Sequence, residues 1–260
     1  MDGVPHYMVG IAAPSENWSV ARFAEEAGRC VEDILKRKKL PILTGGSGLY
    51  MDAVIAGHGF APGETGSPVR ARLQEELKKN GIKPLLEELR TVDPESAEKL
   101  HPADEKRILR ALEVYRQTGK TITQHNRETR ARPNRYAPVY IGLAYRDRAD
   151  MREQIDRRVD AMLAAGLLEE VRVLVDAGVP RTATAMQAIG YKELLAALDG
   201  KCSLEEAVEE VKLRSRQYAK RQLTWLRRSP DIHWIYWEKQ RDFVRALQEA
   251  TEILITYGLQ

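Results

Sequence analysis

The alternation of hydrophobic and polar residues predicts a chain that is mostly helical. Apolar residues recur every three to four positions in many stretches, which is the period of an amphipathic helix. Ser19 precedes the first stretch, and Ser203 with Glu206 precedes the longest, where such side chains cap the free amides of a first turn. The predicted helices cover residues 19–35, 49–55, 68–79, 83–91, 94–100, 104–118, 148–165, 167–177, 191–198, 203–228 and 241–256.

Three short apolar runs predict β-strands, at residues 40–44, 139–143 and 232–237. The run at 40–44 predicts a buried parallel strand. It is followed by the glycine-rich turn 45–48 and a helix, which is the order of elements in α/β proteins. Doubly wound sheets usually have about five or six strands. With three strands, and without a first strand and its phosphate loop, we expect an α/β protein whose beginning is absent from this sequence.

The strands are unevenly placed, and this predicts two domains. Residues 1–66 and 136–260 carry all three and are expected to form an α/β core. Residues 67–135 carry none and are expected to form an all-helical insertion, which ends in a polar stretch from Gln124 to Arg135 with Pro133 and Asn134 as breakers. The TGKT at 118–121 resembles the end of a phosphate loop, but Val114 stands where the first glycine is required. We therefore interpret Gly119 as a helix C-terminal turn.

Composition restricts the class of protein. The chain is 43% hydrophobic and 30% charged, which suits a globular protein with a real core. Its apolar runs are far shorter than the ~20 residues of a membrane span, and no secretory signal is visible at its start. The two cysteines, Cys30 and Cys202, are isolated, so we expect neither a disulfide framework nor a zinc site. These features indicate a reducing, cytoplasmic location.

Charge is concentrated in two segments although the net charge is only +3. Residues 105–135 carry nine Lys and Arg against three Glu, and residues 211–228 carry seven with no acid. Two such segments indicate a polyanion partner, and the alternative is a pair of solvated helix faces. Cations at the end of a helix also complement its dipole. That explanation covers the last turn of the 203–228 helix but not Lys212, Arg214 and Arg216.

Three further features are candidates for binding chemistry. The glycine turn 45–48 allows a backbone to approach a ligand closely, or is only a turn. Arg158 borders the apolar face of its helix, so it must either bind an anion or extend to solvent. Arg70 lies in the first turn of its helix, where the positive end of the dipole makes a purely structural cation less natural.

Several segments together resemble the tRNA dimethylallyltransferases, in family order and spacing over essentially the whole chain. They are VPH at 4–6, PILTGGSGLY at 41–50, HPAD at 101–104, RILRALEV at 107–114, MQAIGYKE at 186–193 and KRQLTWLR at 220–227. The resemblance implies a P-loop-type α/β core with a helical insertion. It also implies transfer of a dimethylallyl group from dimethylallyl diphosphate, with Mg²⁺, to the exocyclic amine of the adenosine 3′ of the anticodon.

The resemblance also implies roles for individual residues. Ser47, where the family usually has threonine, would be catalytic and would contact the target nucleotide. Arg158 would be catalytic by binding the donor's diphosphate, with charge stabilised by Arg158 and Mg²⁺ as it develops. No metal ligand from the chain is predicted. The other residues implied to bind the tRNA anticodon stem-loop are Arg70, Lys106, Arg107, Arg110, Gln187, Gly190, Tyr191, Lys192, Lys220, Arg221, Gln222, Trp225 and Arg227.

The sequence departs from the family at its beginning. The family's P-loop, Gly-x-x-x-x-Gly-Lys-Ser/Thr, and the Asp-Ser motif with the expected general base are not in these 260 residues. The main hypothesis is therefore a tRNA dimethylallyltransferase, expected to be monomeric and away from membranes. The alternatives are a catalytically inactive tRNA-binding remnant of that family and, third, a relative of small-molecule kinases.

Overall fold

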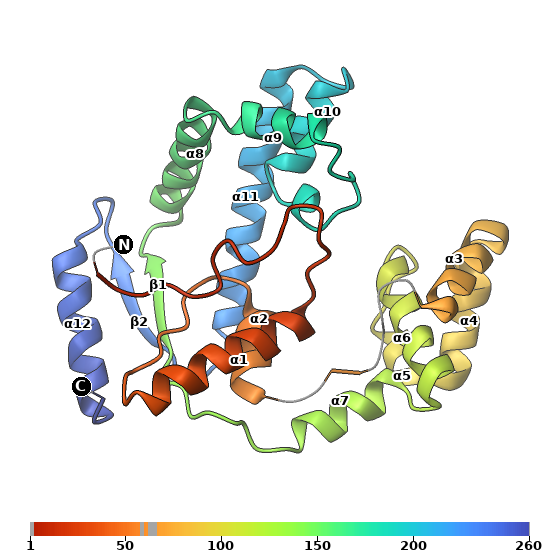
Figure 1. Cartoon of the computed structure of the whole chain (residues 1–260), viewed down its shortest axis with the longest axis horizontal. Coiled ribbons are helices and arrows are strands. Elements are labelled where there is room, and N and C mark those ends of the chain that lie inside the picture. The colour runs from red at the N-terminus through yellow and green to blue at the C-terminus, as the bar shows by residue number, and fades with distance from the viewer. Residues whose placement is uncertain (1–2, 58–59, 62–66, 260) are drawn as a thin grey trace. The chain divides into compact units, whose positions relative to one another are not determined.

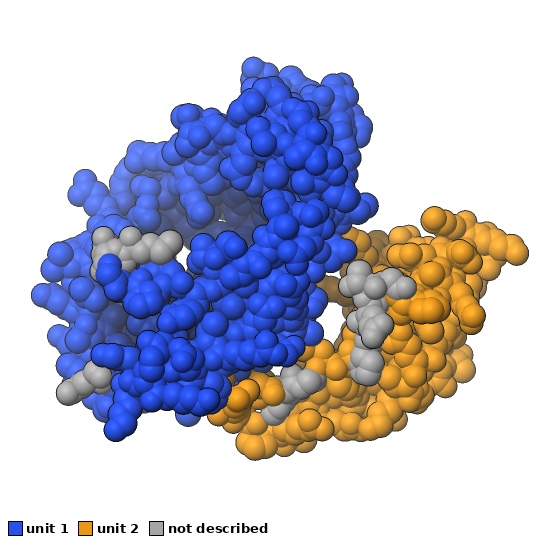
Figure 2. Space-filling view, in the orientation of Figure 1, with its two compact units in different colours: residues 1–55, 137–260 blue, residues 56–136 orange. Residues whose placement is uncertain are grey.

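The structure, a computed structural model, describes residues 3–57, 60–61 and 67–259. It divides into two compact units, one of residues 1–55 with 137–260 and one of residues 56–136 (Figure 2). The second unit is thus a continuous segment inserted into the sequence of the first.

The first unit combines two strands with helices from both ends of the chain (Figure 1). Its elements are α1 (Val20–Lys36), α2 (Gly48–Ala56, whose last residue begins the second unit), β1 (Ile141–Tyr145), α8 (Arg148–Ala164), α9 (Leu167–Asp176), the short 3-10 helix η1 (Ala185–Gln187), α10 (Tyr191–Leu198), α11 (Leu204–Leu226), β2 (His233–Trp237) and α12 (Phe243–Thr256). The predicted N-caps are confirmed: Ser19 accepts from the Arg22 amide, and Ser203 and Glu206 form a capping box.

Strands β1 and β2 form a parallel pair in which Ile141 lies opposite His233 and Tyr145 opposite Trp237. Helix α12 packs against β2 and buries Ile235 and Trp237. These are the strands expected at 139–143 and 232–237, and they agree with the prediction of an α/β core with a parallel sheet.

The strand predicted at residues 40–44 is wrong. Residues 40–44 have no strand structure, and the side chain of Ile42 is 76% exposed. A β-strand requires a hydrogen-bonded neighbour. Within the described residues β1 and β2 pair only with each other, so this apolar segment has no strand beside it.

A second core in the first unit lies among α9, η1, α10 and α11. Val171, Met186, Leu194 and Ala207 are fully or almost fully buried there. This core anchors the amino-terminal half of α11, and the helix then continues to Leu226 beyond it.

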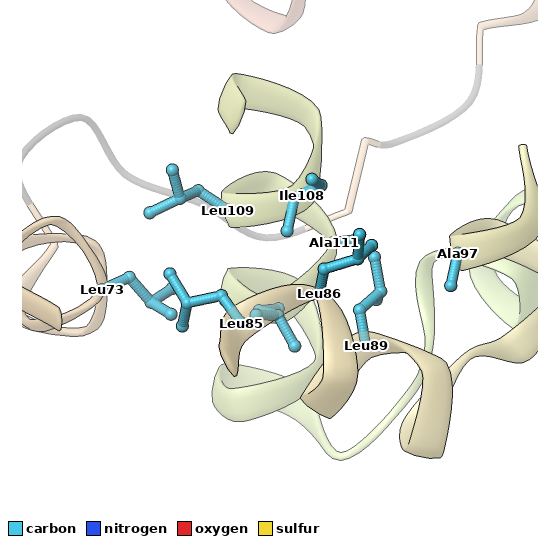
Figure 3. Close-up of a cluster of buried hydrophobic side chains, with 9 residues drawn as sticks. Leu73, Leu85, Leu86, Leu89, Ala97, Ile108, Leu109 and Ala111 are labelled. Atoms are coloured by element: carbon cyan, nitrogen blue, oxygen red, sulfur yellow. The ribbon is translucent and has the colours of Figure 1, made fainter. Parts of the chain in front are cut away.

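The regular elements among the described residues of the second unit are all helices, and the unit has a core of its own (Figure 3). Leu73, Leu89, Ile108 and Leu112 are completely buried in that core. Its helices are α3 (Pro68–Asn80), α4 (Ile82–Val92), α5 (Pro94–Glu98), α6 (Glu105–Thr118) and α7 (Ile122–Arg130).

Two details of this unit bear on the sequence predictions. Gly119 ends α6 in the left-handed conformation, with φ of 70°, as expected for a C-terminal turn. Helix α7 forms over the first half of the polar stretch, as far as Arg130, where the sequence predicts no helix. Thr121 and Gln124 build a capping box, and α7 buries none of its residues, so it has no apolar face to reveal it.

Candidate nucleic-acid interface

The glycine-rich turn of residues 45–48, hereafter the glycine loop, packs directly against α11. A Cβ atom at Gly48 would lie 2.1 Å from the ring of Trp225, and one at Gly46 would lie 1.6 Å from the side-chain amide of Gln222. Only a residue without a Cβ allows the backbone to approach this closely. The two glycines therefore dock the loop on α11.

Ser47 lies between these contacts, at the start of α2. Its Oγ is 3.4 Å from the hydroxyl of Tyr218, and its carbonyl accepts from the amides of Tyr50 and Met51. Tyr218, Gln222 and Trp225 are spaced by four and three residues, so they share one face of α11. The loop thus presents the exposed Ser47 beside the carboxyl-terminal half of that helix.

A cavity of about 220 Å³ lies next to this contact. It is lined by Asp52, Tyr140, Trp225, Leu226, Arg228 and Ser229. The indole Nε1 of Trp225 donates to Asp52 Oδ2 at 3.2 Å. Burial raises the pKa of the Asp52 carboxyl, although the Trp225 hydrogen bond and the charge of Arg228 oppose the change. Burial and the charge of Asp52 also raise the pKa of Tyr140.

The raised pKa of Asp52 predicts a pH-dependent cost to stability. The folded protein retains this proton to a higher pH than the unfolded chain, so the stability contributed by Asp52 falls as the pH rises from about 4 through the folded pKa. Asp52→Asn keeps an oxygen acceptor for Trp225 and removes the charge. We expect the variant to be at least as stable as the wild type at about pH 7, with a smaller stability loss between about pH 4 and 7, in urea unfolding. A variant less stable at neutral pH would contradict this reading.

The basic residues of α11 fall into two groups. Those in its middle are paired with acids: Arg216 Nη1 lies 2.6 Å from Asp156 Oδ1, Lys212 Nζ 2.8 Å from Asp160 Oδ1, and Arg214 is paired with Glu210. Asp156 and Asp160 belong to α8. Arg216 and Lys212 therefore join α11 to α8, and Arg214 is paired within α11, which accounts for the three cations that the helix dipole does not explain.

The cations at the carboxyl-terminal end of the helix are different. Lys220, Arg221, Arg227 and Arg228 are exposed and, within the part of the chain that the structure describes, none is in an ion pair. The guanidinium of Arg221 lies over the Tyr218 ring, 5.7 Å from its centroid. Cations that are not held in an ion pair can neutralise phosphates and release counterions. This end of α11, beside the glycine loop, is the candidate RNA-binding surface of the first unit.

Arg158 of α8 is exposed and makes no hydrogen bond or ion pair with any described residue. Its exposure is compatible with both alternatives that the sequence leaves open, an anion partner or extension to solvent. Its neighbour Arg157 is paired with Glu153. No described contact joins Arg158 to the glycine loop, so the structure leaves these two predicted catalytic elements unconnected while bringing Ser47 to α11.

The segment 187–192 is held mainly by protein contacts. Gln187 Nε2 donates to the Arg181 carbonyl at 2.8 Å, and Gly190 caps α10 with φ of 101°. The Tyr191 hydroxyl donates to Glu170, and burial together with that bond raises the pKa of Tyr191 to about 12. Lys192 is exposed and has no partner among the described residues. In this segment Lys192 is therefore the side chain most available to RNA.

The second unit brings four predicted residues to helices α3 and α6. Lys106 and Arg107 are exposed in the first turn of α6, and Arg107 is 3.7 Å from Asp104. Arg70 and Arg110 both approach the buried carboxylate of Glu113. Glu113 is not among the site residues that the sequence predicts. Its place on the buried face of α6, three residues after Arg110, is the signal that identifies it.

Comparison with known proteins gives a consistent result. The family model described as IPP transferase matches residues 1–229. A protein of a Thermoanaerobacter species named tRNA dimethylallyltransferase is 42% identical over 258 residues, which cover 99% of this chain and 81% of that relative. A relative of the same name from Caldanaerobacter subterraneus is 41% identical, over 98% of this chain and 81% of its own length.

Solved structures agree with the sequence comparison. The crystal structure of a tRNA isopentenylpyrophosphate transferase from Bacillus halodurans matches with a TM-score of 0.68 and 36% identity, over 98% of this chain and 79% of that one. A eukaryotic dimethylallyltransferase described as acting on tRNA matches with a TM-score of 0.79 and 27% identity, over all of this chain and 67% of that one. This chain belongs to the IPP transferase family, among relatives named tRNA dimethylallyltransferases.

Proposed function

We propose that this protein is a tRNA dimethylallyltransferase. It transfers the dimethylallyl group of dimethylallyl diphosphate to the exocyclic amine of the adenosine 3′-adjacent to the anticodon. A carbon–nitrogen bond forms at the amine, the carbon–oxygen bond to the diphosphate breaks, and the amine loses a proton. Family membership and the 42% identity to a relative of that name support this assignment.

The main structural support for the proposal is the close packing of the glycine loop against α11. Gly46 and Gly48 fix Ser47 beside Tyr218 and next to the unpaired cations that begin at Lys220. A hydroxyl and two aromatic rings beside a cationic helix end suit an RNA nucleotide, because phosphates bind the cations while an unstacked base contacts aromatic rings. Removing a base from its stack costs a few kcal/mol, which these contacts must offset.

Arg158 is proposed to bind the diphosphate of the donor. Its guanidinium makes no bond to described residues, so all its donors are free for phosphate oxygens. Charge builds on the diphosphate as the carbon–oxygen bond breaks, and a guanidinium in contact with those oxygens stabilises that charge where it develops.

Magnesium is proposed only as an ion that accompanies the diphosphate. Within the described residues no three His, Cys, Asp or Glu side chains gather in a way that could hold a metal. We therefore assign no ligand from the chain to this ion. Magnesium in proteins commonly binds substrate phosphates and keeps several waters, which is compatible with an ion carried by the donor.

The decisive experiment incubates the full chain with labelled dimethylallyl diphosphate, Mg²⁺ and an anticodon stem-loop RNA. We expect label in the RNA when adenosine is 3′-adjacent to the anticodon, and none when guanosine replaces it. RNA binding without transfer would favour the alternative of an inactive tRNA-binding member of the family, and neither binding nor transfer would refute both.

We also propose that the protein is a monomer and that it acts in the cytoplasm. Its substrates are a folded RNA and a small diphosphate, and neither requires a membrane. Among the described residues no helix combines the length and the hydropathy that crossing a bilayer requires.

A further inference from the structure

The second unit contains one buried carboxylate that the proposed chemistry does not use. The Glu113 side chain is 6% exposed, and it lies on the face of α6 that packs on the core. Its Oε1 accepts a hydrogen bond from Ser67 Oγ at 2.9 Å, and its Oε2 accepts one from Arg110 Nη1 at 3.0 Å. A buried charge with two hydrogen bonds and an ion pair has a defined position.

The same carboxylate also attracts a second arginine from another helix. Arg70 Nη1 of α3 lies 3.7 Å from Glu113 Oε2, the oxygen that Arg110 also contacts. The two guanidinium groups are therefore neighbours, although their residues are forty positions apart in sequence. Ser67, the N-cap of α3, connects the two helices. Its hydroxyl donates to Glu113 of α6 and accepts from the Arg70 amide at 3.1 Å.

In this cluster of Ser67, Arg70, Arg110 and Glu113, the Arg110 guanidinium is fixed by protein contacts and the Arg70 guanidinium is less constrained. Arg110 Nη2 donates to the Ala61 carbonyl at 2.7 Å, which fixes a second edge of its guanidinium. Arg70 makes no side-chain hydrogen bond among the described residues, and its side chain is 23% exposed against 36% for Arg110. Arg70 and Arg110 share one carboxylate, so the cluster has a net charge of one positive unit. Both guanidinium groups are partly exposed to solvent.

We propose that Glu113 is a positioning residue for tRNA binding, which holds Arg70 and Arg110 together so that their guanidiniums bind one RNA phosphate. This inference rests on the proposed function, since it deepens the tRNA-binding role expected for the two arginines. Each arginine alone is a flexible side chain, and ordering it on binding costs conformational entropy. Glu113 orders both before RNA arrives, and the phosphate completes the charge balance.

The direction in which one substitution changes RNA affinity distinguishes this positioning role from a purely electrostatic effect. Glu113→Gln keeps the shape and an oxygen acceptor for Ser67, but its amide donors face a guanidinium that also only donates. Removing an acid makes the surface more positive, so electrostatics alone predicts tighter RNA binding. If Glu113 positions the arginines, the same change weakens binding instead.

The test measures the Kd of the full chain for an anticodon stem-loop RNA by fluorescence anisotropy at several salt concentrations. We expect Glu113→Gln to raise Kd by about tenfold and to reduce the slope of log K against log salt by about 1, the loss of one phosphate contact. The matched control is Glu105→Gln, which removes an exposed acid from the same helix and should leave Kd unchanged or lower it. A partly unfolded sample would bind less RNA without a change in slope.

The outcomes are distinguishable from failure of the function itself. If the wild type does not bind the RNA, the proposed function fails. If it binds and Arg70→Ala weakens binding, while folded Glu113→Gln binds as well as or better than the wild type, the positioning role alone is refuted. Should Glu113→Gln not fold, Ser67→Ala serves instead, since it removes a donor to Glu113 and changes no charge. A Kd for RNA that is unchanged in folded Ser67→Ala would then overturn the proposal. A higher Kd together with a smaller slope of log K against log salt would support it.

Discussion

Arg158→Gln should lower the rate of dimethylallyl transfer by about a hundred- to a thousandfold, the effect typical of removing one donor that stabilises developing charge. The substitution keeps a polar side chain of similar length but removes the cation proposed to bind the diphosphate. Arg158 is exposed and has no partner among the described residues, so stability should change by less than about 0.5 kcal/mol. Steady-state kinetics with dimethylallyl diphosphate and stem-loop RNA, together with a urea melt, measures both effects.

The adjacent arginine supplies the control. Arg157 is also exposed and lies on the same helix, but it is paired with Glu153. Arg157→Gln removes the same charge from α8 one position away and should leave kcat within about twofold of the wild type, since surface pairs contribute little. Equal losses in both variants would mean that the charge of α8, and not contact by Arg158, supports the reaction.

Gly48→Ala should destabilise the protein by about 2 kcal/mol and abolish most transfer activity. The new Cβ would lie 2.1, 2.2 and 2.6 Å from three atoms of the Trp225 ring, which is closer than any real contact. That ring is also fixed by its hydrogen bond to Asp52, so the glycine loop must move away from α11. Overpacking of this kind typically costs about 1–3 kcal/mol. Denaturant unfolding gives the stability change, and a transfer assay shows whether Ser47 has been displaced.

Gly46→Ala tests the same contact where the neighbour can yield. Its Cβ would lie 1.6 Å from Gln222 Nε2, the end of a flexible side chain that can rotate away. We expect a loss below about 1 kcal/mol, mostly from the displaced amide. If this variant were as unstable as Gly48→Ala, backbone strain in the loop and not the Trp225 contact would be responsible.

Local structure was predictable from sequence wherever the signal is itself local. The caps at Ser19 and Ser203, the strong apolar period of α1 and the left-handed Gly119 each depend on residues within one or two turns. Residues 191–198 form α10 with the predicted bounds. The failures have equally physical causes. The segment 40–44 has the composition of a strand but no neighbour to pair with, and α7 has a capping box but no apolar face.

The candidate site was less predictable, because its chemistry depends on partners distant in sequence. The basic run 211–228 is continuous in sequence, yet the structure divides it, since Asp156 and Asp160 of α8 neutralise its middle and leave its end unpaired. No periodicity in α11 shows where those aspartates lie. Glu113 is similar: its link to Arg70 joins α3 and α6 and becomes visible only when the two helices pack.

The ends of the inserted unit also have a consequence for how such proteins evolve. The Arg135 amide donates to the Ala56 carbonyl at 3.2 Å, so the chain leaves this unit next to the point where it entered. The unit also has a hydrophobic core of its own, which is a property of a domain that can fold independently. Adjacent ends and independent packing are the features that allow a domain to be inserted or replaced without changing the path of the host polypeptide.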